Sequence, residues 1–189
     1  MSAPFPSRAW AADEAEGLFD SLPYPSLEVL SHLRGRGVSA DGLSEPELPR
    51  MATVRFNGSF FAFVEAADSG GEALIFLARD DMGRPADLVA WSPRHKELAP
   101  HFGAVGILGA DDLLASRLTA EAALAVHRTP FEWLLAERCG VVILDPDRAA
   151  IELRDFGPFA AQDEQHGLML RALFRAREPR IYVPERRAA

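Results

Sequence analysis

The sequence contains little cysteine and no long apolar run, and these absences exclude several classes of protein. Cys139 is the single cysteine among 189 residues, so the chain cannot form an internal disulfide or a zinc site built from several cysteines. No uninterrupted apolar segment reaches the ~20 residues that a membrane-spanning helix requires, and we expect no membrane partner. The first residues lack a basic segment followed by an apolar core, so we expect no secretory signal peptide and a cytoplasmic location.

Basic charge and catalytic signature motifs are also scarce. The 20 Lys and Arg residues stand against 28 Asp and Glu residues, and the net charge of -8 argues against a broadly basic surface for nucleic acid. No serine lies in a G-x-S-x-G segment, and no glycine-rich phosphate loop is present. His95, His101 and His166 lack the i, i+4 spacing of metal ligands on one helix. The remaining composition, 48% hydrophobic and 25% charged, is typical of a globular protein of about one domain.

Proline and glycine interrupt residues 1–50, which predicts short helices and a linker. The expected elements are a helix at 7–22, a second helix from its cap Ser26 to Leu33, and a loop at 39–49. The loop is the best candidate for a hinge. We therefore divide the chain into an N-terminal helical segment with its linker (1–50) and an α/β globular domain (51–189), which together form one compact domain.

The central part of the chain has the pattern of short strands joined by tight turns. The expected strands cover 56–66, 73–79 and 86–92, and the expected turns cover 68–71 and 80–85. Asn57-Gly58-Ser59 matches a glycosylation sequon, but we expect it to form a turn. This order predicts an antiparallel three-stranded meander.

Strands and helices alternate in the C-terminal half. The expected strands cover 104–108, 124–126, 141–144 and 181–183, and the expected helices cover 111–118, 129–138, 148–156 and 163–177. Thr129, Pro130 and Glu132 provide a cap, a first-turn proline and a capping-box glutamate. The continuous apolar run at 141–144 is typical of a strand buried on both faces. We therefore predict an α+β fold, in which the meander precedes a small strand-helix-strand α/β unit with an interior second strand, followed by a C-terminal helix.

The stretch GVVILDPDRAA at 140–150 places two aspartates directly after this apolar strand. Carboxylates at the C-terminal edge of an α/β sheet are suitable ligands for Mg²⁺, so Asp145 and Asp147 can hold a metal for phosphoryl transfer, with Asp111 or Asp112 as a further ligand. Asp-Pro is also a common turn opener, and Asp145 is well placed to cap the following helix. The turn interpretation is favoured, because no further acidic residue is clearly placed to complete a metal site, and Asp111 is first explained as the start of another helix.

Two further groups of residues are candidates for a functional site. His127 and Arg128 follow a strand and precede a capped helix whose N-terminus favours anions, although packing against the sheet is the commoner explanation. Arg34 and Arg36, with His32, form a basic cluster at the end of the second helix, where such residues are most often solvated.

Three other side chains are assigned to the interior. Trp133 lies on a helix of the α/β unit, and His166 lies on the apolar face of the last helix. Cys139 precedes an apolar strand, has no convincing base partner and is expected to be a small buried side chain.

The segment LSHLRGRGV at 30–38 resembles one in Toprim-type DNA primases of phages and plasmids, where a helix and an Arg-Gly turn precede a β-rich stretch and the Toprim fold. Residues 73–83 are similar to that β-rich stretch, and 124–128 occupy the place of the family's strand ending in Glu-Gly. The family's metal-binding glutamate falls on His127 and its glycine on Arg128. Asp145 follows with room for a single helix, so Asp145 and Asp147 end the second strand and not the family's D-x-D strand. The resemblance implies a shortened, catalytically silent relative.

Two functional hypotheses follow. In the first, the chain is a non-enzymatic accessory or interaction protein of a mobile genetic element that needs no cofactor, and its partner is another protein or a nucleic acid. The alternative is a small phosphoryl-transfer or nucleic-acid-processing enzyme that uses Mg²⁺. The first hypothesis is favoured, because two-metal chemistry needs several convergent carboxylates and the sequence offers two near neighbours.

Overall fold

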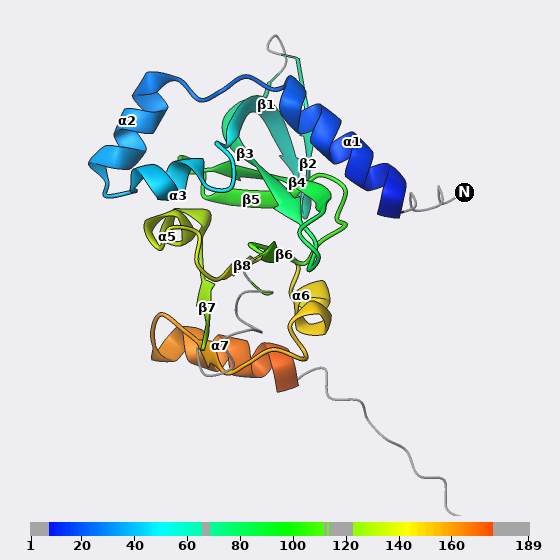
Figure 1. The fold of residues 1–189 in the computed structure, drawn as a ribbon, viewed down its shortest axis with the longest axis vertical. Coiled ribbons are helices and arrows are strands. Elements are labelled where there is room, and N and C mark those ends of the chain that lie inside the picture. The colour runs from blue at the N-terminus through cyan, green and yellow to red at the C-terminus, as the bar shows by residue number, and fades with distance from the viewer. Residues whose placement is uncertain (1–7, 66–68, 112, 114–122, 176–189) are drawn as a thin grey trace, which may run out of the picture.

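The structure is a computed structural model that describes residues 8–65, 69–111, 113 and 123–175, with side chains from residue 12 onward. It is mixed α+β, with a five-stranded antiparallel sheet, a four-stranded mixed sheet and flanking helices (Figure 1). The N-terminal helices are α1 (Arg8–Ser21), α2 (Leu27–Gly35) and α3 (Ala40–Ser44). No described helix is long and apolar enough to cross a membrane.

The large sheet has the strand order β2-β1-β3-β4-β5. Its strands are β1 (Arg50–Asn57), β2 (Phe60–Phe63), β3 (Gly71–Arg79), β4 (Pro85–Ser92) and β5 (Glu97–Pro100). The strands expected at 73–79 and 86–92 are confirmed as β3 and β4. The turn expected at Asn57-Gly58-Ser59 is confirmed, but the single strand expected at 56–66 is wrong, because the chain reverses at this turn (Gly58 φ 64°) and forms a hairpin. β1 then lies between β2 and β3, so residues 56–92 are not a simple meander.

Both faces of the large sheet are buried. One face packs against α1, with Phe19 beside Ile75 and Leu88. The other face carries Leu74 and Trp91 and packs against α2, α3 and α5 (Pro130–Leu135). Continuous burial along the middle of β3 and β4 follows from this double cover.

The small sheet has the strand order β6-β8-β7-β9. Its elements are β6 (Ile107–Leu108), β7 (Leu124–His127), α5 (Pro130–Leu135), β8 (Val141–Ile143), α6 (Pro146–Glu152), β9 (Phe159–Ala160) and α7 (Glu164–Arg175). β7 and β8 are parallel and α5 joins them, which confirms the strand-helix-strand unit with an interior second strand. The predicted capping box of α5 is also confirmed. The strand expected at 181–183 and most of the helix expected at 111–118 lie outside the described residues.

Several local expectations are corrected. The loop expected at 39–49 contains α3, which begins because the Ser39 side chain accepts a hydrogen bond from the Gly42 N–H. The helix expected at 148–156 begins at Pro146, a favourable first helical position, and ends at Glu152. The run 141–144 is fully buried in its first half, whereas Ile143 and Leu144 are half-buried.

A buried arginine connects α3 to the end of α5. Arg138 is 8% exposed and donates hydrogen bonds to the carbonyl oxygens of Gly42 (2.9 Å), Leu43 (2.8 Å) and Glu47 (2.9 Å). Burial lowers its pKa to about 10. Glu137 and Arg138 have φ values of 54° and 62°, and this left-handed turn ends α5 earlier than the residue 138 expected from the sequence.

Candidate functional site

The predicted site residues of the small sheet lie where its parallel strands end. β7 ends at His127, whose Nε2 donates a hydrogen bond to the carbonyl oxygen of Cys139 at 2.8 Å. The Arg128 guanidinium makes two contacts with the Asp163 carboxylate, at 2.6 and 2.7 Å. This pairing raises the pKa of Arg128 and lowers that of Asp163. This ion pair links the residue that follows β7 to the residue that precedes α7.

His166 lies next to this ion pair and is 5% exposed, as expected for a core or boundary histidine. Its Nδ1 accepts a hydrogen bond from the Gln162 N–H at 3.3 Å, and its own N–H donates to Asp163 Oδ1 at 2.8 Å. Burial lowers the pKa of His166, and the neighbouring Arg128 cation acts in the same direction. The imidazole is therefore held in its neutral form as a structural hydrogen-bond acceptor.

Asp145 has the geometry of a helix cap. Its carboxylate accepts hydrogen bonds from the N–H groups of Asp147 (2.8 Å) and Arg148 (3.3 Å) at the start of α6. The turn interpretation of GVVILDPDRAA is thereby confirmed. Asp111 is exposed where the chain leaves β6. Within residues 8–65, 69–111, 113 and 123–175, no three His, Cys, Asp or Glu side chains are grouped so that they could hold a metal ion.

Cys139 is exposed, which corrects the expectation of a small buried side chain. The left-handed turn at Glu137 and Arg138 determines this outcome, because it directs the Arg138 side chain inward and leaves the next residue at the surface. The expectation for Trp133 is confirmed: it is buried, and its indole N–H donates to the carbonyl oxygen of Gly140 at 3.0 Å.

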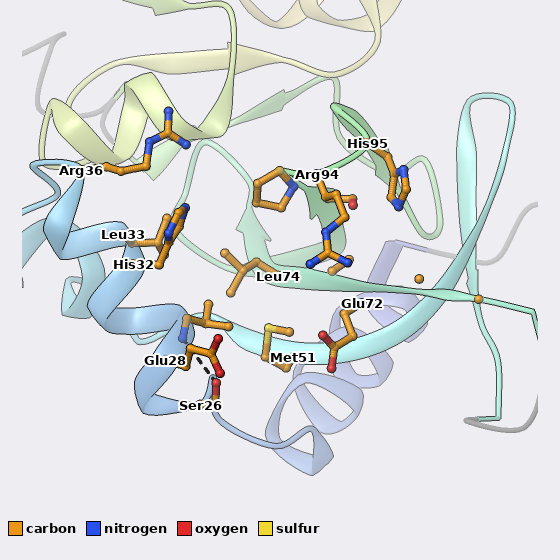
Figure 2. A pocket seen from close by; sticks show the side chains of 16 residues that line it. Ser26, Glu28, His32, Leu33, Arg36, Met51, Glu72, Leu74, Arg94 and His95 are labelled. Atoms are coloured by element: carbon orange, nitrogen blue, oxygen red, sulfur yellow. Dashed lines mark hydrogen bonds between the residues drawn. The ribbon is translucent and has the colours of Figure 1, made fainter.

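A groove of about 880 Å³ lies between α2 and the large sheet, and we call it the α2 groove (Figure 2). One wall is α2, which contributes Glu28, His32 and Arg36. The opposite wall carries Glu72 of β3 and the turn after β4, with Arg94 and His95, and Met51 and Leu74 lie between the walls. The groove therefore combines an apolar floor, against which a ligand can pack, with charged walls that can orient it.

The residues of the basic cluster predicted on α2 have different surroundings in the structure. Arg36 lines the α2 groove, and its guanidinium stacks 3.9 Å from the centre of the Phe131 ring. His32 also lines the groove. Arg34 is exposed on α2 and is not a lining residue.

The rest of the α2 groove was missed by sequence reasoning. One signal was present: Glu28, His32 and Arg36 follow each other at intervals of four residues, which places three polar side chains on one face of a helix. The opposite wall gave no such signal, because Glu72 lies at the start of β3 and Arg94 lies in the turn after β4, and these two positions come together only through the register of the β3–β4 hairpin.

Comparisons of the chain with protein-family models, with curated proteins and with solved structures found no match. The functional assignment therefore depends on the geometry of the chain itself.

Proposed function

We propose that the protein is a non-enzymatic interaction protein that recognises its ligand in the α2 groove. The observation that carries the proposal is the arrangement of charge in this groove, where side chains of both signs face a cavity with an apolar floor. The candidate residues of the small sheet have other tasks. Asp145 caps α6, and Arg128 is paired with Asp163.

The resemblance to Toprim-type primases forms a second part of the proposal. We infer a degenerate Toprim-like protein of a mobile genetic element, in which His127 replaces the family's metal-binding glutamate. The parallel pairing of β7 and β8 across α5 is compatible with such a unit and supports the inference. The hydrogen bonds that the Asp145 carboxylate accepts from the N–H groups of α6 support a helix-capping role for this side chain in place of a metal-binding role.

Calorimetric titration with Mg²⁺ and Mn²⁺ tests the non-enzymatic assignment. We expect the parent protein and the variants Asp145→Asn and Asp147→Asn to give the same heats, because neither carboxylate belongs to a metal site in this proposal. Hydrolysis of bis(p-nitrophenyl) phosphate with either metal should also be equal in the three proteins. A micromolar metal site, or a metal-dependent rate, that either substitution abolishes would refute the proposal.

A further inference from the structure

We infer that His166 is an acid-sensitive switch that opens the connection between β9 and α7 (residues 161–163) while the rest of the small sheet stays folded. The switch is independent of the α2 groove, since neither His166 nor the connection lines that groove. It depends on the hydrogen bond that the His166 ring accepts, on the charges around the ring and on the separate anchors of α7.

The His166 ring holds the connection through its Nδ1 atom. This atom accepts a hydrogen bond from the Gln162 N–H at 3.3 Å, which requires that Nδ1 carries no proton. A protonated imidazole has a donor at both ring nitrogens, so it cannot accept this bond. Protonation of His166 therefore removes the bond and sets two N–H groups against each other.

The other contacts of the connection are made at the surface. Gln162 Oε1 accepts a hydrogen bond from the Arg128 N–H at 3.3 Å, and the Asp163 carboxylate binds the Arg128 guanidinium at 2.6 and 2.7 Å. Gln162 and Asp163 are exposed, so water competes for these contacts. The His166 ring is buried, and its bond is the contact of the connection that water replaces least easily.

The charges around His166 oppose a proton on the closed ring. Within the described residues, the groups that act on it are Arg128 and His127 at the end of β7, Glu132 on α5 and Asp163 before α7. Both carboxylates already have partners, because Asp163 is paired with Arg128 and Glu132 belongs to the capping box of α5. A proton on the closed ring is therefore a poorly compensated buried charge, and opening relieves it by exposing the ring to water.

The opening is confined to the first turn of α7, because the rest of this helix has its own anchors. Leu170 is buried in the apolar core of the small sheet. Phe174 stacks on Phe159 of β9, with the ring centres 4.7 Å apart and the ring planes 5° from parallel. Since neither contact involves a titratable group, both persist in acid and hold β9 and the second half of α7 in place.

Amide hydrogen exchange of the full chain tests the inference. The protection factor, which corrects the exchange rate for the pH dependence of the exchange chemistry, is compared between about pH 7.5 and pH 5. We expect the protection factor of the Gln162 amide to fall about tenfold in acid, since the closed form is lost as the pH falls through the lowered pKa of His166. The Leu170 amide, on the anchored part of α7, should keep its protection factor.

The variants His166→Asn and His127→Gln distinguish between the two neighbouring histidines. His166→Asn keeps an acceptor oxygen near the position of Nδ1 but takes up no proton, so its Gln162 protection factor should be the same at both pH values. His127→Gln is the matched control and should retain the fall. In the parent protein, the midpoint of the fall should coincide with the titration of the His166 ring signals in nuclear magnetic resonance spectra, a measurement that needs no variant.

Four results would overturn the inference about the switch. They are a constant Gln162 protection factor in the parent protein, an equal fall at Leu170, a fall that persists in His166→Asn, and a midpoint that differs from the titration of the His166 ring.

Discussion

Individual polar side chains hold the segments of this protein together by bonding to backbone groups. Asp87 is fully buried, and its carboxylate accepts hydrogen bonds from the backbone N–H groups of His101, Phe102 and Ala104. These residues lie where the chain passes from the large sheet toward the small one. Burial raises the pKa of Asp87, although these hydrogen bonds oppose the shift. Arg138 has the complementary role, since it donates to carbonyl groups around α3. A buried polar group without such partners is destabilising, so each of these residues fixes a specific backbone arrangement.

The titration of His166 makes the free energy of unfolding depend on pH. Its pKa in the folded chain is lowered from 6.5, first by burial and then by the Arg128 cation, so the unfolded chain takes up the proton more readily. The stability that neutral His166 contributes is therefore present above pH 6.5 and is lost as the pH falls through its folded pKa. We expect His166→Gln to remove this loss. Urea unfolding between about pH 7.5 and 5 measures it, and parallel pH profiles for parent and variant would contradict the assignment.

At the scale of elements, caps and buried strands make unequal contributions to stability. We expect Asp145→Ala to reduce the free energy of unfolding by about 0.5–2 kcal/mol, the usual loss for a helix cap. Ile107 is fully buried and pairs with Ile143 across the small sheet, so Ile107→Ala should cost about 2–5 kcal/mol. Ile143→Ala should cost less than Ile107→Ala, because Ile143 is half-buried.

Urea unfolding of these three variants in the presence of a chelator is the measurement. An Asp145→Ala protein that is more stable than the parent would contradict the cap assignment. Such a result would indicate a carboxylate retained for function at the expense of stability.

The elements with local signals were predictable from the sequence. Ser26 and Thr129 identified the starts of α2 and α5, and the apolar run from Val141 identified an interior strand. The turn at Asn57-Gly58-Ser59 was expected, but the hairpin of β1 and β2 was not identified, because the aromatic-rich segment on both sides of this turn was predicted as one strand. The early start of β1 at Arg50 depends on its pairing with β3, a contact between segments distant in the sequence.

At the scale of the whole molecule, the α2 groove is a product of tertiary packing. Leu33 anchors α2 in the same apolar cluster as Leu74 and Trp91, and this packing brings the polar face of the helix opposite Glu72 and Arg94. The sequence could predict the polar face of α2 but not its position over the sheet, which depends on contacts between distant segments. The small-sheet residues were easier to identify in the sequence, since they are adjacent to strand ends and helix caps.

The location of binding is the central claim, and nuclear magnetic resonance tests it most directly. Backbone ¹H–¹⁵N spectra of the full chain should be recorded during titrations with a panel of small metabolites that carry charged groups and, separately, with Mg²⁺. We predict that a panel member that binds shifts the amide signals of the groove, including Val29, Leu33 and Leu74, and leaves those of His127 and Asp145 in place. Shifts confined to His127 and Asp145, with a metabolite or with Mg²⁺, would contradict the account and place the functional site at the edge of the small sheet.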